Sequence, residues 1–450
     1  MGETGKTGMT DKRKGKAWVP RCWRRRPRGG TSVLDRWSRE ALRRSLTLMP
    51  GLLVLVLGTS MAQPPVSRLT LEEAVMLATR ENTTIRAKAF ERQATAAQEI
   101  TAALRPNPTA SFSAEQLASR PVEPQYTVAV EQTIETGGKR QRRIAAARAA
   151  TRVVDFEVDD TRRQIATQVK KAFTDALLAQ ALLALANQNL QTIDEVERLQ
   201  RLRAAKGDIA ELELTRLQVQ RFAFERDAAD AAQALQAAKI SLRTLVGPET
   251  VAEDVTLIGD LAYRDRVLER ESLLRQALAR RPDLRAAEAT RQRAQAEVAL
   301  ARANASWDLT PQLQYQRIGS DNTLGVGLSI PLRLFDRNQG EIARSRAEIQ
   351  HTDALLEAAV IQIRADVATA LSQIQAARQK VSLLQDTYLP KAQRARETVA
   401  YAYRHGGLSL LDFLDAERTY RETVIEHLRT LAGYWTALYE LEAAVGGELE

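Results

Sequence analysis

Four short segments of the chain alternate hydrophobic residues with small or polar ones, at 109–116, 125–133, 312–318 and 324–330. In the last segment, Val326, Leu328 and Ile330 alternate with Gly327 and Ser329. A period of two is typical of a β-strand that has one apolar and one polar face. Such strands suit a sheet with lipid on one side and water on the other. The alternative is a small soluble sheet, but only long alanine-rich helices flank these strands, with no other apolar layer.

Between these segments, hydrophobic residues recur every three or four positions, which indicates helices. The stretch from Ile144 to Lys206 has 63 residues without proline or glycine, and as one helix it would be roughly 95 Å long. The pattern also predicts helices over 70–105 and 271–306. Leu389-Pro390 lies within the second long helix, where we expect a bend because proline removes a backbone hydrogen bond.

The body of the chain repeats one plan twice. Ile85-Arg86-Ala87 returns as Leu284-Arg285-Ala286 after 199 residues, and Val128-Ala129-Val130 returns as Val326-Gly327-Leu328 after 198. We therefore predict a repeat 1 at 63–247, a linker at 248–270, a repeat 2 at 271–446 and a C-terminal tail at 447–450. Each repeat is expected to contain a helix, two strands and a long helical hairpin.

Charge is concentrated in the first 62 residues, which hold 14 of the 65 basic and 4 of the 56 acidic residues. The remaining 51 basic and 52 acidic residues nearly cancel, so the body has no net attraction for nucleic acid. Arg43-Arg44, the apolar run from Leu46 to Leu57 and Ser60-Met61-Ala62 resemble a secretory signal, so we expect 1–62 to be a removed targeting segment. An uncleaved anchor is the alternative. Cys22, the only cysteine in the sequence, lies in this segment.

Four strands cannot close a barrel, and open sheet edges do not survive in lipid. Three chains would supply twelve strands, which is within the size range of membrane barrels. The sequence therefore predicts a mainly α fold with a small membrane β-barrel part. In this prediction a trimeric 12-stranded β-barrel is continued by a long α-helical barrel, with two internal repeats per chain.

Several stretches resemble the TolC-type outer membrane factors, over residues 70 to about 446. They are Glu131-Gln132 to Gly138-Lys139-Arg140, Pro331 to Gly340-Glu341-Ile342, and the segment 410–418. The turn 335–340 is most similar to the CzcC-type branch, which serves heavy-metal efflux. Strand-to-helix junctions are expected at Gly138, Lys139, Pro331 and Gly340.

The resemblance implies a homotrimeric outer membrane duct in a Gram-negative-type bacterium, with its helical barrel in the periplasm. Its partners would be a periplasmic adaptor, an inner-membrane RND pump and outer membrane lipid, and its cargo heavy-metal cations. A duct for drug efflux or type I secretion is an alternative. A soluble periplasmic coiled-coil adaptor or scaffold is a second one, although adaptors usually have a single helical hairpin within β-rich domains.

Asp412 and Asp415 lie three residues apart, on one helix face, and in a trimer would form two stacked acidic rings that favour cations. The resemblance places them at the closed channel entrance, and Glu213 is the counterpart of Asp412 in the first repeat. Two solvated surface acids are the alternative. Tyr403 matches a tyrosine that latches neighbouring hairpins in the family. The latch arginine of the family falls on Leu408, so Arg404 is a candidate substitute.

Gly207 and Asp208, and Gly406 and Gly407, are expected at the tips of the two hairpins, where the glycines need a positive φ. These tips are candidate adaptor contacts. His351, His405 and His427 are scattered, so we expect no fixed metal site and no cofactor. No nucleophile motif or phosphate-binding loop is present, so we expect no enzyme.

Overall fold

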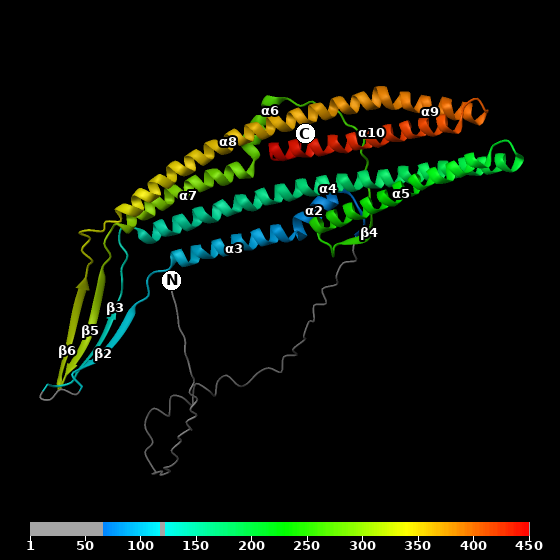
Figure 1. The fold of residues 1–450 in the computed structure, drawn as a ribbon. Helices are drawn as coiled ribbons and strands as arrows, with labels where there is room; N and C mark the ends of the chain where they lie inside the picture. The colour runs from blue at the N-terminus through cyan, green and yellow to red at the C-terminus, as the bar shows by residue number, and fades with distance from the viewer. Residues whose placement is uncertain (1–65, 118–121, 450) are drawn as a thin grey trace, which may run out of the picture. The chain divides into compact units, whose positions relative to one another are not determined.

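The computed structural model describes residues 66–117 and 122–449, and these described residues form one compact unit. The expected targeting segment 1–62 lies outside the described residues. In this compact unit the helices and strands follow the same order twice (Figure 1). The mainly helical fold predicted above is therefore confirmed.

The first half begins with the short strand β1 (Val66–Leu69). Its further elements are α2 (Leu71–Glu81), α3 (Thr83–Ala103), β2 (Thr109–Glu115), β3 (Gln125–Glu131), α4 (Lys139–Lys206) and α5 (Glu211–Val246).

The second half begins with the strand β4 (Val251–Leu257). It continues with α6 (Arg270–Arg280), α7 (Pro282–Asn304), β5 (Thr310–Ile318), β6 (Asp321–Ser329), α8 (Gln339–Ser382), the π-helix η2 (Leu383–Tyr388), α9 (Leu389–Arg404) and α10 (Leu410–Val445). The boundaries 63–247 and 271–446 remain a prediction.

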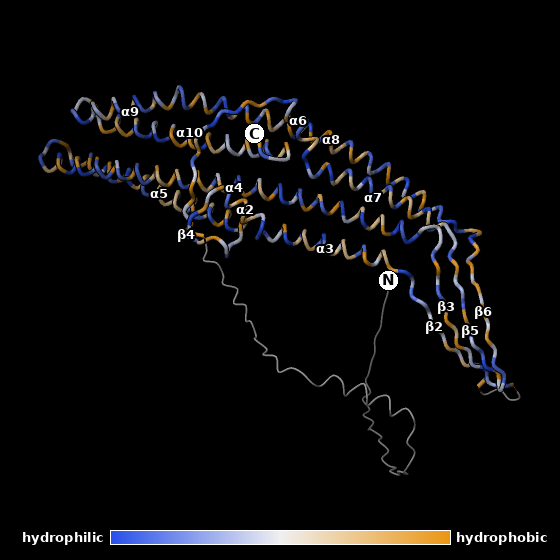
Figure 2. Tube along the Cα trace, turned by 180° about the vertical axis from the view of Figure 1, so that it is seen from behind, coloured by the Kyte–Doolittle hydropathy of each residue, from blue (hydrophilic) through white to orange (hydrophobic). Residues whose placement is uncertain are grey.

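The four strands predicted from alternation form one antiparallel sheet in the order β2-β3-β5-β6. One row across this sheet pairs Phe112 with Val128, Val128 with Tyr315, and Tyr315 with Leu324, and all four side chains are exposed. The neighbouring row, on the opposite face, contains Ser113, Thr127, Gln316 and Thr323. The sheet therefore has an exposed apolar face and a polar face, and Figure 2 shows both kinds of residue along its strands.

A second sheet, which the alternation pattern did not predict, joins the start of repeat 1 to the predicted linker. β1 pairs in parallel with β4, and Leu69 lies opposite Leu257. Val251, Val255 and Leu257 of β4 are buried against α2 and α4. The predicted linker 248–270 thus contains a structured strand.

Each helix predicted before a strand pair is interrupted at equivalent positions, Asn82 and Arg281, 199 residues apart. The Asn82 amide donates to the Leu245 carbonyl oxygen at 2.8 Å, while its own oxygen caps α3 by accepting from the Thr84 N–H. Arg281 is buried, donating to Asp366 at 2.8 Å and to the Ala444 carbonyl oxygen at 3.3 Å. Both breaks therefore bind the end of the last helix of their own repeat.

The long helices lie side by side in two groups (Figure 1). Next to the sheet, α3 packs on α4, α4 on α7, and α7 on α8. Toward the hairpin ends, α5 packs on α4, α4 on α10, and α10 on α9. Thus α4 belongs to both groups, and α3, α8, α5 and α9 are their outer helices.

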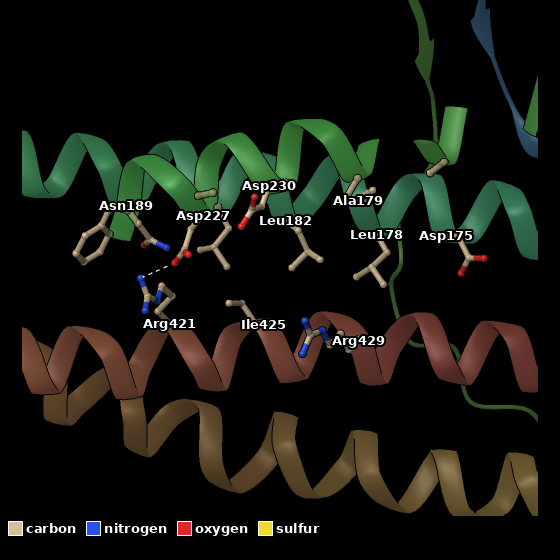
Figure 3. A pocket seen from close by; sticks show the side chains of 16 residues that line it. Asp175, Leu178, Ala179, Leu182, Asn189, Asp227, Asp230, Arg421, Ile425 and Arg429 are labelled. Atoms are coloured by element: carbon tan, nitrogen blue, oxygen red, sulfur yellow. Dashed lines mark hydrogen bonds and ion pairs between the residues drawn. The ribbon is translucent and has the colours of Figure 1, made fainter. Parts of the chain in front are cut away.

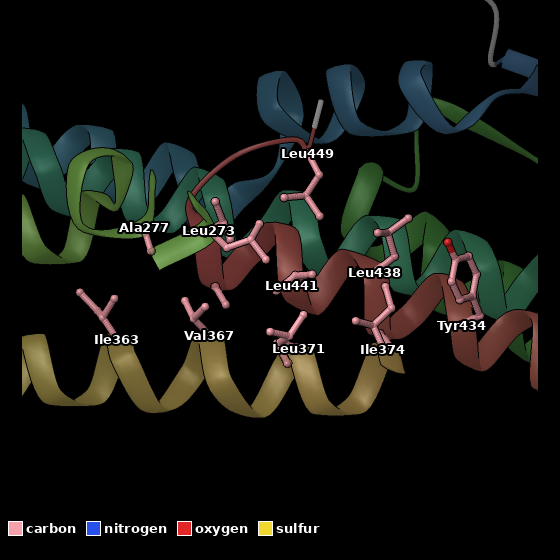
Figure 4. Packing of buried hydrophobic residues seen from close by; sticks show 14 of the residues in the cluster. Leu273, Ala277, Ile363, Val367, Leu371, Ile374, Tyr434, Leu438, Leu441 and Leu449 are labelled. Atoms are coloured by element: carbon pink, nitrogen blue, oxygen red, sulfur yellow. The ribbon is translucent and has the colours of Figure 1, made fainter. Parts of the chain in front are cut away.

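Each half has its own apolar core. In the second half, Ile363, Val367, Leu371 and Ile374 of α8 meet Leu438 and Leu441 of α10, as Figure 4 shows. The α8 residues recur every three or four positions, so they share one helix face. Burial of each large side chain contributes about 1.5–3 kcal/mol, which holds α8, α10 and α6 together.

The bend expected at Leu389-Pro390 coincides with a change of helix type. The π-helix η2 ends at Tyr388, directly before α9, whose first turn contains Pro390. Within the described residues, no helix combines the length and the apolar character needed to cross a membrane.

Candidate functional site

The two helical hairpins end in similar glycine turns. Gly207 closes α4 with a φ of 79°, and Gly406 follows α9 with a φ of 77°. The N–H groups of Asp208 and Gly407 each donate to a carbonyl five residues earlier, on Arg203 at 2.9 Å and Ala402 at 2.8 Å. These bonds complete equivalent helix caps. Positive φ is needed only at Gly207 and Gly406, so the expectation of a positive φ at Gly407 was wrong.

Asp412 lies in the first turn of α10 and caps that helix. Its carboxylate accepts the Ser409 N–H at 3.1 Å and the Ser409 hydroxyl at 2.7 Å, and the Asp412 N–H donates back to that hydroxyl at 3.2 Å. The pKa of Asp412 is lowered by the hydroxyl bond first and the backbone bond second. Asp412 is exposed, so it can carry charge at the hairpin end as well as cap α10.

Asp415 is also exposed, one turn further along α10, and pairs with Arg418 at 2.7 Å. Glu213 lies in the first turn of α5 and is exposed. The structure therefore places all three acids within the first two turns of the helices that follow the hairpin tips. The Ser409–Asp412 capping box was missed, although the spacing Ser-x-x-Asp before an apolar helix is a known sequence signal for one.

Tyr403 is buried where the two hairpins of the chain meet. Its hydroxyl accepts a hydrogen bond from the Gln200 amide of α4, and its ring stacks on Phe413 with centroids 4.9 Å apart. The Arg203 guanidinium lies 5.6 Å from the ring centroid. Burial raises the pKa of Tyr403, Arg203 and Gln200 oppose that shift, and Glu213 adds to it.

The Arg404 Nε donates to the Ala400 carbonyl oxygen of its own helix at 3.2 Å. Its role as a substitute for the missing latch arginine stays a prediction. Within the chain, Gln200 and Arg203 contact Tyr403, and both belong to the other hairpin. Sequence reasoning missed them because a glutamine in a long helix carries no signal of burial.

Each hairpin also contains a buried charged contact. In the first, Glu197 accepts from Arg201 at 2.6 Å, Arg221 at 2.9 Å and Gln218 at 3.2 Å. In the second, the Arg396 Nε donates to Glu417 at 2.8 Å. With the repeat offset of 199, Glu197 corresponds to Arg396 and Gln218 to Glu417. The buried carboxylate therefore lies on the first helix of the hairpin in one half and on the second helix in the other.

The pKa of Glu197 reflects two opposing effects. Burial would raise it, but the hydrogen bond from Gln218 and the charges of Arg201 and Arg221 bring it below its ordinary value. The carboxylate is therefore held ionised between α4 and α5.

A cavity of about 520 Å³ separates the first hairpin from α10 (Figure 3). Leu178 and Leu182 of α4 point into it, with Ile425 of α10 opposite them. At one end Arg421 pairs with Asp227 at 3.2 Å and lies 4.9 Å from the Phe224 ring centroid. The two hairpins are therefore joined by polar contacts at Tyr403 and at Arg421, with an apolar cavity beyond.

The strand-to-helix junctions differ between the halves. Gly138, with a φ of 71°, precedes α4, and the buried Lys139 pairs with Asp308 at 2.6 Å. In the second half Pro331 follows β6, and Asn338, with a φ of 60°, precedes α8. Gly340 lies within the first turn of α8, one residue after the helix begins at Gln339. The Asn338 amide anchors this junction to the Ala301 carbonyl oxygen at 2.7 Å.

No group of three or more His, Cys, Asp or Glu side chains is arranged to hold a metal ion within residues 66–117 and 122–449. His405 stacks on Tyr401 with centroids 4.1 Å apart, and His351 lies 3.4 Å from Glu348. Burial lowers the pKa of His427. The three histidines are thus in separate environments.

Comparison with known protein families gives one match in each half of the chain. Residues 75–248 and 273–447 each match the outer membrane efflux protein family. The chain is 28% identical over 397 residues to the cobalt-zinc-cadmium resistance protein CzcC of Cupriavidus metallidurans, covering 86% of this chain and 94% of that protein. It is 27% identical over 293 residues to the pyoverdine export outer membrane protein OpmQ of Pseudomonas putida, covering 62% and 61%.

Solved structures share the fold. The channel CusC superposes with a TM-score of 0.71 at 20% identity, covering 85% of this chain and 94% of that one. The open-state MtrE channel of Neisseria gonorrhoeae gives a TM-score of 0.70 at 20% identity, covering 84% and 89%. Since the family matches both halves and most of the chain, this protein belongs to the outer membrane efflux protein family.

Proposed function

We propose that this protein is the outer membrane channel of a tripartite, RND-type efflux system that exports heavy-metal cations from the periplasm. The observation that carries the proposal is the relation to CzcC, a cobalt-zinc-cadmium resistance protein, over 94% of that protein's length. Family membership supports the channel role itself. As a conduit, the protein would perform no covalent chemistry.

The two faces of the four-stranded sheet support a position in the membrane. Phe112, Val128, Tyr315 and Leu324 form an exposed apolar row, whereas glutamine, serine and threonine side chains occupy the other face. Lipid would cover the apolar face, and water would fill the lumen on the polar face. Gly138, Lys139, Pro331 and Gly340 would then mark where the strand part ends and the periplasmic helices begin.

The edges of the molecule support a homotrimer. β2 and β6 are the end strands of the sheet, and α3 and α8 are the outer helices beside it. Both outer helices expose apolar side chains, including Phe90 and Ile100 on α3 and Leu355 and Ile361 on α8. A head-to-tail ring of three copies would cover these surfaces and supply twelve strands, enough for a closed membrane barrel.

The hairpin ends would face the inner-membrane partners. Gly207, Asp208, Gly406 and Gly407 are exposed turn residues, so they can contact a periplasmic adaptor that links the channel to an RND pump. Asp412, Asp415 and Glu213 lie just behind these turns and would form acidic rings at the entrance, favouring cations. Tyr403, held by Gln200, would help to keep the two hairpins together when the entrance is closed.

A growth experiment tests the cargo. Deletion of the gene in its own host should increase sensitivity to cobalt, zinc or cadmium salts, and a plasmid copy should restore growth while the empty plasmid does not. The same strains would be tested for sensitivity to dyes and antibiotics. Siderophore export would also be measured, because OpmQ is a pyoverdine export protein. Sensitivity to organic compounds alone would show that the metal assignment is wrong, while leaving the channel role intact.

A further inference from the structure

We infer that two copies join by the same strand register that joins the two halves within one chain, with Gly327 of β6 opposite Ser113 of the next subunit and Leu328 opposite Phe112. This inference rests on the proposed homotrimer and assigns the residues of its membrane seam. If this pairing is right, it determines the whole register between β6 and β2 of the next subunit, because one residue pair determines all the others in an antiparallel ladder.

The two strand hairpins have matching registers. β2 pairs with β3 so that Ser111 lies opposite Ala129 and Phe112 opposite Val128. β5 pairs with β6 so that Gln312 lies opposite Gly327 and Leu313 opposite Val326. An offset of 198 carries β3 onto β6, and an offset of 201 carries β2 onto β5. The hairpins therefore superpose residue by residue, with their apolar faces on the same side.

The pairing between the two strand hairpins of one chain is the template for the pairing between two subunits. β3 pairs with β5 so that Ala129 lies opposite Gln314 and Val130 opposite Leu313. In a ring of identical copies, β6 of one subunit meets β2 of the next, just as β3 meets β5 inside the chain. Adding 198 to the β3 residue and subtracting 201 from the β5 residue gives the pairs between subunits. Ala129–Gln314 then corresponds to Gly327–Ser113, and Val130–Leu313 corresponds to Leu328–Phe112.

The faces of the strands agree with this register. Leu328 is 62% exposed and Phe112 67% exposed, and both lie on the apolar face of the sheet. Gly327 and Ser113 lie on the polar face, which would line the lumen. A slip of one residue would place Phe112 opposite Gly327 and mix the two faces, which is unfavourable in a sheet between lipid and water.

A slip of two residues would preserve the faces, so the cysteine pairs described below, and not the faces, separate it from the proposed register. Inside the chain, the Ile134 N–H donates to the Leu309 carbonyl oxygen at 2.7 Å, just beyond the paired strands. The same offsets place Leu332 opposite Pro108 of the next subunit. Leu332 is 80% exposed, and the Pro108 carbonyl can accept its N–H although proline has none to return.

Cysteine pairs test the register, because the predicted mature chain contains no cysteine. In a Cys22→Ser background, the full-length protein would carry Gly327→Cys with Ser113→Cys. The matched control carries Gly325→Cys with Ser113→Cys, two residues away on the same face. In both glycine variants the new side chain meets the flexible end of a glutamine, Gln312 or Gln314, so the local disturbance is similar. A third variant, Ala129→Cys with Gln314→Cys, is the positive control, because these two residues lie opposite each other within one chain.

Membranes would be oxidised, denatured in SDS and separated without reductant. We expect covalent dimers and trimers from the 327/113 pair, reversed by reductant, at a yield at least fivefold above the 325/113 pair. The internal 129/314 pair should form within one chain and leave the protein monomeric on the gel.

A stronger 325/113 cross-link, or none from either pair while an amine-reactive cross-linker still captures a trimer, would overturn the register and leave the proposed function standing. If the internal pair forms and no trimer is captured by any reagent, the homotrimer itself fails, and the register fails with it.

Discussion

At the scale of single residues, Tyr403 shows how a site expected from sequence acquires different partners in the fold. The family resemblance led us to expect an arginine as the partner of this tyrosine, but within the chain Gln200 and Arg203 of the other hairpin contact it. Gln200 is 1% exposed, so its amide depends on the Tyr403 hydroxyl for a hydrogen bond. The contact therefore links the two hairpins of the chain.

Tyr403→Phe should lower the stability of the purified protein by about 1–3 kcal/mol, because it leaves a buried amide without its partner. Thermal denaturation followed by circular dichroism measures the effect. Tyr401→Phe, on the exposed side of the same helix, is the matched control and should denature like the unchanged protein. Equal midpoints for the two variants would show that the Gln200–Tyr403 contact does not stabilise the hairpins.

At the scale of elements, the buried charges inside the hairpins were not predicted, although the offset of 199 already aligned their positions. Glu197 and Arg396 are ordinary helix residues in the sequence, and nothing in a helical period distinguishes a buried charge from a solvated one. Only the approach of α5 to α4 and of α10 to α9 decides that these side chains are enclosed and paired.

The Glu197 contact predicts a dependence on pH. Because the pKa of Glu197 is lower in the folded protein than in the unfolded chain, its contribution to stability is present above the ordinary pKa of a glutamate and is lost as the pH falls through the lower folded value. Glu197→Gln should lower stability by about 1.5–3 kcal/mol at neutral pH and flatten the dependence in acid.

Denaturation midpoints measured from pH 7 down to pH 3 would test this expectation. Glu195→Gln, an exposed position on the same helix, is the control and should keep the dependence of the unchanged protein. An identical acid profile for Glu197→Gln and Glu195→Gln would contradict the assignment of that dependence to the buried carboxylate.

At the scale of the whole molecule, Asp412 and Asp415 become entrance rings only in the proposed assembly. Asp412→Asn with Asp415→Asn should shift the reversal potential in a salt gradient toward the non-selective value, because the carboxylates that favour cations are removed. Single-channel recording in planar bilayers measures this shift.

The capping role of Asp412 requires a separate control. Ser409→Ala removes the hydroxyl partner of the capping box and leaves both carboxylates in place. It should weaken the start of α10 without changing ion selectivity. If Ser409→Ala shifted the reversal potential as much as the double variant, the effect would arise from the helix end and not from the acidic rings.

The sequence by itself determined the periodic features of this protein. Alternation located the four strands of the main sheet, spacings of three and four located the long helices, and offsets near 199 showed that one plan is used twice. These features are local or repetitive, because each depends on which face of an element is apolar. The family resemblance followed from the strand-to-helix stretches between these elements and from the segment 410–418.

Only the tertiary structure decided the contacts between distant parts of the chain. It paired β1 with β4 inside the predicted linker, interrupted helices at Asn82 and Arg281, and chose Gln200 as the partner of Tyr403. Such contacts depend on which elements meet after folding, and a short strand or a single polar residue has no period to indicate it. In the proposed homotrimer, the repeat would extend one of these contacts, because the strand pairing between the two halves would recur between neighbouring copies.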